Sequence, residues 1–160
     1  MLFSSAFGQD TTCFIKKIDK FTNIATLESK RVQIDPDLTI KIYMPVAKDE
    51  GSLHPLNLFF TSKKVTALDE DSRITLIFED GTKRELGHKG GFELEGLFSV
   101  ILFNNLRLEY DKGVIENLAK KRITAIRING LKTLADTDVN DVIGNTIKDT
   151  FACMYTSWNK

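Results

Sequence analysis

The sequence has few of the residues that most often carry catalysis or bind metals. Its 160 residues include two histidines and two cysteines. Neither His54 nor His88 has a second metal ligand at helical or strand spacing. No glycine-rich phosphate-binding pattern and no nucleophile motif occurs. We therefore expect a protein that is not an enzyme and that uses no cofactor and no metal ion.

An excess of charge and a long apolar run are also missing. The 22 basic and 22 acidic residues cancel to a net charge of +0, so no overall field draws phosphate backbones to the chain. The best apolar run, 97–102, is interrupted by Ser99 and is far shorter than the roughly 20 residues that cross a bilayer. We expect neither a nucleic-acid partner nor a transmembrane segment.

The nearest approach to a metal motif is the segment 136–140. Asp136, Asp138 and Asn140 copy the first three ligand positions of a calcium loop. Asp141 replaces the glycine that makes the sharp turn, however, and Ile147 stands where a glutamate closes the site. We interpret the acidic residues as the N-terminal cap of a helix.

The clearest positive signal is a hairpin between Arg73 and Leu86. Apolar and polar residues alternate up to Asp80-Gly81, a pair that favours a tight turn because glycine tolerates positive φ. Apolar or alternating segments separated by turn residues continue from Thr11 to Tyr110. The strands expected around this hairpin are 13–18, 24–34, 38–44, 56–60, 97–103 and 106–110.

Two helices are expected, both after most of the strands. Asp111 can cap a short helix near 112–121, which leads into a strand from Ile123 to Ile128. A longer helix is expected from Thr137 to about Met154, with one apolar face made of Val139, Val142, Ile143, Ile147, Phe151 and Met154. This order predicts an α+β, mainly β fold, either an antiparallel β-sandwich or a strongly curved meander sheet, covered by the C-terminal helix.

The first eight residues resemble the end of a secretory signal peptide. Ala6 and Gly8 have the small side chains that signal peptidase requires, but a basic front region is missing. We expect 1–8 to be a signal-peptide remnant and 9–160 a single domain that is periplasmic or secreted. The alternative is an ordinary N-terminal strand in a cytoplasmic protein.

The two cysteines, Cys13 and Cys153, lie near opposite ends of the chain. In an exported protein we expect them to form a disulfide, because the first strand and the last helix of a small domain share one core. Such a bond would close a loop of about 140 residues. Two reduced thiols in a cytosolic protein are the alternative.

Four short motifs occur in order along the chain. They are Cys13, the segment Asp19-Lys20-Phe21-Thr22 between two strands, Asp80-Gly81-Thr82, and Ile123-Thr124-Ala125-Ile126-Arg127-Ile128 after the short helix. This order resembles a group of uncharacterised, exported, β-rich bacterial proteins, in which glycine is common at the position of Asn23. The resemblance implies export and a sheet-plus-helix fold, and it implies no activity.

These observations favour an exported, non-enzymatic domain that binds a protein or a small molecule, or that supports a cell-envelope process. The alternative is a carrier of a small apolar ligand, with a cavity inside the sheet. Its candidate lining residues are the phenylalanines Phe59, Phe60, Phe78, Phe92, Phe98 and Phe103.

Overall fold

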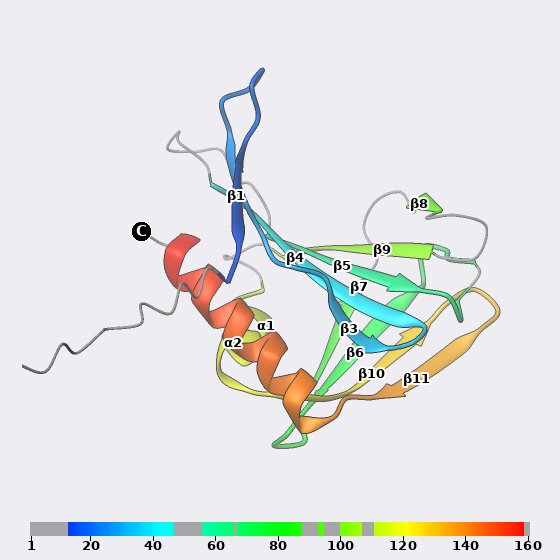
Figure 1. The fold of residues 1–160 in the computed structure, drawn as a ribbon. Coiled ribbons are helices and arrows are strands. Elements are labelled where there is room, and N and C mark those ends of the chain that lie inside the picture. The colour runs from blue at the N-terminus through cyan, green and yellow to red at the C-terminus, as the bar shows by residue number, and fades with distance from the viewer. Residues whose placement is uncertain are drawn as a thin grey trace, which may run out of the picture.

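The computed structural model describes residues 13–46, 56–65, 67–87, 93–94, 100–106 and 111–158. Within these ranges the chain is mainly β, with two helices (Figure 1). The strands are β1 (Ile15–Ile18), β2 (Ala25–Glu28), β3 (Val32–Asp35), β4 (Leu38–Val46), β5 (Leu56–Ser62), β6 (Arg73–Phe78), β7 (Lys83–Gly87), β8 (Glu93–Leu94), β9 (Val100–Leu106), β10 (Ile123–Asn129) and β11 (Leu134–Asp138). The helices are α1 (Lys112–Lys120) and α2 (Asp141–Trp158).

The larger sheet is antiparallel and has the strand order β1-β2-β4-β5-β9-β8, with β3 also paired to β4. Its central strands have the alternating pattern of a sheet that is buried on one face. Ile40 and Ile42 of β4 lie in the core at 1% and 2% exposure, whereas Lys41 between them is half-buried on the outer face. The sequence therefore produces one apolar and one mixed face on the same strands.

The smaller sheet has the order β11-β10-β6-β7, and it contains the predicted hairpin between Arg73 and Leu86. Gly81 has a φ of 80°, which explains why glycine follows Asp80 at this turn. Ile74, Leu76 and Phe78 of β6 are all buried. The hairpin is confirmed as a structural part of the sandwich.

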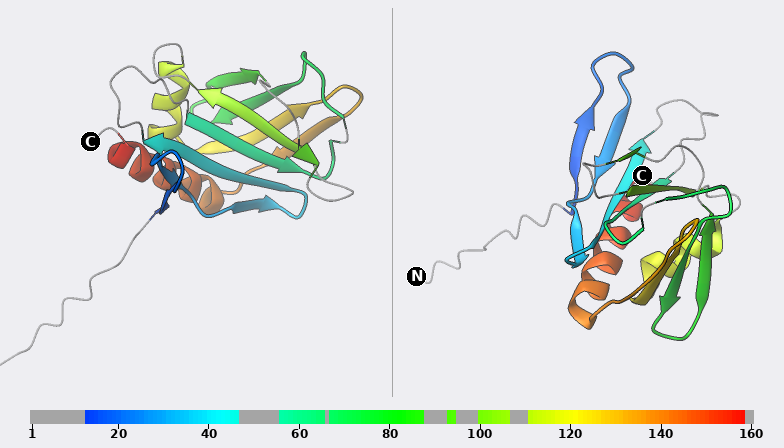
Figure 2. Two further views of the ribbon diagram at one scale, coloured as in Figure 1. Left: turned by 90° about the horizontal axis from the view of Figure 1, so that it is seen from above. Right: turned by 90° about the vertical axis from the view of Figure 1, so that its right-hand side faces the viewer.

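The two sheets form two layers, and α2 runs along one side of them (Figure 2). Helix α2 contacts β3, β4 and β10, so it packs against both sheets. Its residues Ile147, Phe151 and Met154 belong to the same buried cluster as the inner faces of the strands. The predicted α+β, mainly β fold with a C-terminal helix is confirmed, and its strands form two antiparallel sheets.

The prediction that the last helix begins at Thr137 is wrong. Residues up to Asp138 belong to β11, and the cap of α2 is Asn140, whose Oδ1 accepts a hydrogen bond from the Ile143 amide at 2.9 Å. Thr137 and Val139 alternate with exposed residues, as in a half-buried strand. Val142 is 76% exposed, so it does not belong to the apolar face of the helix.

Three other predicted details differ from the structure. The expected strand 24–34 is split into β2 and β3, and β9 continues through Asn104 and Asn105, where a turn was expected. Asp111 precedes α1 but makes no side-chain capping hydrogen bond. The first two differences concern where strands begin and end, and the third concerns only the cap of α1.

Strands β1 and β2 form a hairpin that projects beyond the sandwich (Figure 1). We call residues 15–28 the finger. At its base, Cys13 forms a disulfide with Cys153 of α2, with a Cα–Cα distance of 6.3 Å. This distance lies within the range that a disulfide spans. The bond fastens the start of the finger to the C-terminal helix.

Candidate functional site

Two adjoining hollows lie on the outer face of the larger sheet. One has a volume of about 350 Å³ and the other of about 230 Å³, and Arg31 and Thr61 line both. Ligand sites in proteins commonly have volumes of about 300–1,000 Å³. We call this surface the basic face and define it by Arg31, Lys41, Tyr43, Phe59 and Lys63.

The register of β4 and β5 brings the aromatic and cationic side chains of the basic face together. Lys41 lies opposite Phe59 in the ladder, and Tyr43 lies two residues further along β4 on the same face. The rings of Tyr43 and Phe59 meet edge to face, with centroids 6.0 Å apart and an interplanar angle of 77°. Both rings are half-buried, so they present a firm apolar surface beside charged groups.

Arg31 reaches this face because the chain breaks between β2 and β3. The Ser29 amide donates to the Ile42 carbonyl at 2.9 Å, and the Ser29 hydroxyl accepts from the Ile42 amide at 2.8 Å. The side chain of Ser29 thus takes a position in the ladder that a backbone carbonyl would otherwise fill. Residues 30–31 follow this break outside the strands, and the exposed Arg31 side chain lines both hollows.

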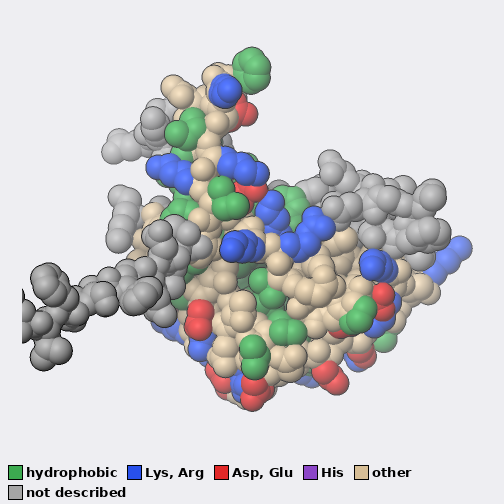
Figure 3. Space-filling view, in the orientation of Figure 1, with side chains coloured by type: hydrophobic (Ala, Val, Ile, Leu, Met, Phe, Trp, Pro, Cys, Tyr) green, Lys and Arg blue, Asp and Glu red, His purple; other side chains and the backbone are tan. Residues whose placement is uncertain are grey.

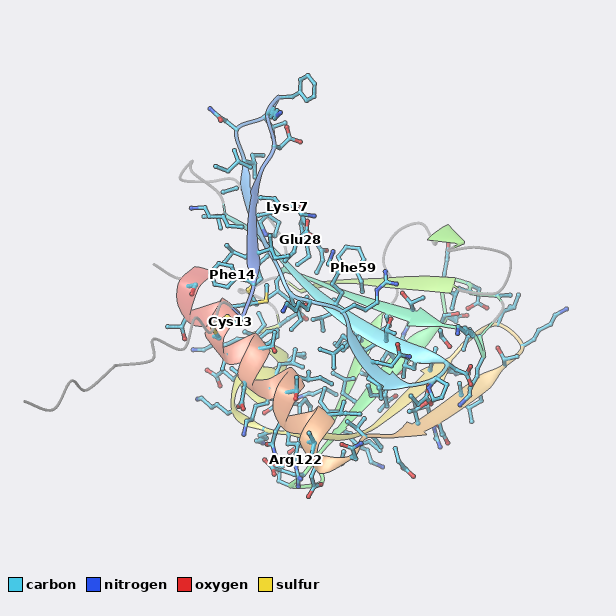
Figure 4. The ribbon with its side chains drawn as sticks, viewed as in Figure 1. Cys13, Phe14, Lys17, Glu28, Phe59 and Arg122 are labelled. Carbon is cyan, nitrogen blue, oxygen red and sulfur yellow. A yellow bond between two sulfur atoms is a disulfide. The ribbon has the colours of Figure 1, made fainter. Side chains whose placement is uncertain are left out.

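A carboxylate connects the basic face to the finger. Glu28 accepts hydrogen bonds from Lys41 at 2.8 Å and from Lys17 of β1 at 2.9 Å (Figure 4). Burial raises the pKa of Glu28, but the hydrogen bonds and charges of the two lysines outweigh burial, so its pKa lies below the ordinary value. Two cations share one anion, so this group keeps one positive charge.

A second carboxylate, that of Asp35, forms a hydrogen-bond network at the other end of the basic face. Asp35 accepts from the Asp37 amide at 2.7 Å and from Lys64 at 3.3 Å, and Thr137 of the smaller sheet donates to it at 3.2 Å. These interactions outweigh burial and lower the pKa of Asp35. Lys63 donates to the Pro36 carbonyl at 3.2 Å. Because this acceptor is neutral, it does not offset the positive charge of Lys63.

The zero net charge of the chain hides an uneven distribution. Residues 13–46 and 56–65 contain eight Lys and Arg against four Asp and Glu, whereas residues 67–87 and 111–158 contain ten against twelve. Figure 3 shows basic side chains gathered along the finger and over the strands beside it. The local excess gives this half of the molecule an attraction for anions that the overall composition does not indicate.

The tip of the finger is ordered by its own hydrogen bonds. Asp19 Oδ1 accepts from the amides of Phe21 at 2.7 Å and Thr22 at 2.9 Å, and the Asp19 carbonyl accepts from the Asn23 amide at 2.8 Å. The amides of Thr22 and Phe21 hold the pKa of Asp19 below its ordinary value. Asn23 has a φ of 60°, a left-handed conformation that asparagine adopts more readily than most residues with a side chain.

Phe21 stands on this ordered tip with 99% of its surface exposed. Sequence reasoning placed it in a turn motif but did not identify it as a functional residue. The available signal was an aromatic residue at the centre of a polar turn, where nothing in the flanking strands could bury it. A fully exposed phenylalanine on a fixed loop is a candidate anchor for a partner.

The sequence-predicted candidates fall in different places. Cys13 and Cys153 are joined, as described above. Phe60 and Phe78 are buried among other core side chains, Phe59 lies on the outer face, and the backbone of Phe103 belongs to β9. The segment 1–8, His54, His88, Phe92 and Phe98 lie outside the described residues.

The calcium-like segment is used for structure. Asp136 of β11 forms two hydrogen bonds of 2.7 Å with Arg127 of the neighbouring strand, which lowers the pKa of this carboxylate. Within the described ranges, no group of three His, Cys, Asp or Glu side chains is placed to hold a metal ion. The two hollows described above lie on the outer face of the larger sheet, away from the interface between the two sheets.

Neither of the described helices, α1 or α2, combines the length and the hydropathy needed to cross a membrane. Comparison of the chain with known protein families, with curated proteins and with solved structures gives no match. The function therefore has to be inferred from the geometry of the basic face and the finger.

Proposed function

We propose that this protein is an exported, non-enzymatic binding domain whose ligand lies on the basic face. The ligand is an anionic molecule with apolar ring faces, and the best fit is an acidic oligosaccharide. One observation carries this proposal: two adjoining hollows place Arg31 and Lys63 beside the edge-to-face pair of Tyr43 and Phe59.

The side chains of this face match the two kinds of surface on such a ligand. Arg31 and Lys63 can donate charge-assisted hydrogen bonds to carboxylate or sulfate groups. The C–H faces of a sugar ring can pack on the rings of Tyr43 and Phe59. Thr61 lies between these groups and lines both hollows, so its hydroxyl is placed to bond a sugar hydroxyl. Because the hollows adjoin along the strands, they suit two successive units of a chain.

The disulfide supports the exported location. Bonds between cysteines persist in oxidising compartments and are rare in the cytosol, where thiols are kept reduced. The order of the four sequence motifs, which resembles that of exported β-rich bacterial proteins, favours the same location. A surface that holds an acidic oligosaccharide would serve a cell-envelope process.

Titration calorimetry with an oligogalacturonate tests the ligand class, with an uncharged cello-oligosaccharide of equal length as the comparison. We expect binding of the charged oligomer only. The double variant Arg31→Gln/Lys63→Gln should weaken it about ten-fold or more, since two charge-assisted hydrogen bonds are lost. The matched control is Lys83→Gln/Arg84→Gln, which removes the same two residue types from exposed positions on β7. Equal weakening by both double variants would contradict a defined site.

Single-stranded DNA provides a second polyanion for the same assay. We expect it to bind more weakly than the oligogalacturonate, and equally to the Arg31→Gln/Lys63→Gln and Lys83→Gln/Arg84→Gln variants, because only diffuse charge attracts it. Tighter binding of the DNA would overturn the proposal and identify the basic face as a nucleic-acid surface.

A further inference from the structure

We propose that the finger inserts its tip into the surface of an anionic lipid bilayer. The proposal goes beyond the basic face, because it rests on Phe21 and on the lysines of the finger. Phe21 is 99% exposed on a loop that its own hydrogen bonds keep in place. An apolar side chain of this size leaves water when the tip enters the boundary between headgroups and acyl chains.

The apolar side chains of the finger point in several directions. Ile15 and Ile18 are 54% and 60% exposed, and their odd spacing along β1 places them on opposite faces of the hairpin. Phe21 adds a third direction at the tip. A groove on a partner protein would contact one face only, whereas a lipid layer surrounds an inserted tip on all sides. The distribution of apolar surface therefore favours lipid.

Several backbone amides at the tip of the finger have hydrogen-bond acceptors within the same loop. Besides the amides bonded to Asp19, the Asp19 amide donates to the Ile24 carbonyl at 3.0 Å, and the Ile24 amide donates to the Thr22 hydroxyl at 3.4 Å. Amides without a partner would make insertion unfavourable, because lipid offers no hydrogen-bond acceptor in place of water. The turn thus provides acceptors within the loop for the amides of Asp19, Phe21, Thr22, Asn23 and Ile24.

Charge on the finger complements an anionic surface. The finger contains three lysines, Lys16, Lys17 and Lys20, against Asp19 and Glu28, so it carries one net positive charge. Lys16 and Lys20 are exposed, and Lys20 is next to Phe21, so its ammonium can reach the headgroups while the ring enters the acyl region. In Figure 3 a hydrophobic side chain ends the projection and basic side chains lie below it. This is the arrangement of a peripheral membrane anchor.

Co-sedimentation with vesicles containing about equal parts of phosphatidylglycerol and phosphatidylcholine tests the proposal on the full chain. We expect binding to these vesicles. Binding to vesicles of phosphatidylcholine alone should be at least about ten-fold weaker. Phe21→Ser should reduce partitioning about ten-fold or more, and Lys16→Gln/Lys20→Gln should have a similar effect. The matched controls are Val142→Ser, an exposed apolar residue on α2, and Lys83→Gln/Arg84→Gln; both should bind as the wild type does.

Fluorescence gives a second readout at the tip itself. Trp158 is the only tryptophan, so Phe21→Trp in a Trp158→Phe background reports on position 21 alone. Its emission should shift to shorter wavelength when the anionic vesicles are added. Emission that stays unchanged, or vesicle binding that Phe21→Ser leaves intact, would overturn the proposal and assign Phe21 to a protein partner. Because Phe21 is exposed, its variants should keep the wild-type denaturation midpoint, and that measurement excludes misfolding as the cause of lost binding.

Discussion

The β1–β2 finger and the β6–β7 hairpin have similar turns and different surroundings. At each turn an aspartate accepts hydrogen bonds from amides that follow it, Asp19 from Phe21 and Thr22, and Asp80 from Thr82. Asp80 also forms an ion pair of 2.6 Å with Lys121, just after α1. By contrast, the hydrogen bonds of Asp19 with the amides of Phe21 and Thr22 stay within its own loop. The same turn chemistry can thus attach a hairpin to the end of a neighbouring helix or hold an exposed tip in place.

The largest expected contrast between the two hairpins is in packing. Phe78 is 1% exposed and Phe21 is 99% exposed, so the same substitution can be made in both. Phe78→Ala should lower the free energy of unfolding by about 3–5 kcal/mol, because it leaves a cavity in the core. Phe21→Ala should change it by less than about 0.5 kcal/mol. Urea denaturation measures both, and a large loss for Phe21→Ala would show that the tip packs on something within the fold.

The second prediction concerns the base of the finger. Replacing both cysteines by serine should lower the free energy of unfolding by about 2–5 kcal/mol, because the bond closes a long loop in the unfolded chain. The two residues are 140 positions apart, so this loop spans most of the protein. Denaturation of the Cys13→Ser/Cys153→Ser variant gives the change, and oxidised wild type is the reference. Identical midpoints would mean that the finger base is held by packing alone.

A third prediction compares two glycines in the helices that cover the sandwich. A Cβ added at Gly144 would lie 2.5 Å from the Ile123 carbonyl oxygen, whereas one at Gly113 would meet nothing closer than 3.5 Å. Gly144→Ala should therefore destabilise the protein by about 1–3 kcal/mol through overpacking. Gly113→Ala should stabilise it by up to about 1 kcal/mol, because alanine is the better helix former. Thermal melts of both variants test the opposite signs.

The smallest predicted effect is a difference between Asp80 and Asp19 in how much each makes the stability of the protein depend on pH. Hydrogen bonds from Lys121 and then Thr82 hold the pKa of Asp80 far below its ordinary value, and Asp19 is also lowered. In the unfolded chain such carboxyls take up protons near their ordinary pKa of 3.8. The stabilisation they provide is thus complete above about pH 5 and declines as the pH falls through the ordinary pKa and below it. The measurement is the denaturation midpoint of each variant between about pH 5 and 2.5. We expect the midpoint of Asp80→Asn to fall less over this range than the midpoint of Asp19→Asn. A larger effect of Asp19→Asn would reverse the comparison.

Local signals explain which parts of the fold were predictable. The β6–β7 hairpin follows from alternation around Asp80-Gly81, and the buried face of α2 follows from the spacing of Ile147 and Phe151. The start of α2 was missed because Thr137 and Val139 fit both a strand and a helix over so few residues. The break between β2 and β3 depends on the hydroxyl of Ser29 bonding a residue thirteen positions away, which no local pattern reveals.

The candidate site was harder to predict than the fold. Tyr43 and Phe59 come from β4 and β5, whereas Arg31 and Lys63 lie just outside strands, and only the assembled sheet places the four together. Overall composition concealed the charge of this half, because acidic residues elsewhere balance it. The exposure of Phe21 depends on how far the finger extends beyond the sandwich, and that distance is a property of the assembled fold.

The disulfide at the base of the finger also decides how the molecule bears a mechanical load. A pull on the tip passes down β1 to Cys13, two residues before the strand begins, and from there through a covalent bond into α2. With the bond intact, the force is shared with a helix that is packed against both sheets. After reduction β1 no longer carries load to α2, and the same force passes down β2 alone into its ladder with β4. A finger attached to a membrane surface would therefore hold its domain most firmly where cysteines are oxidised.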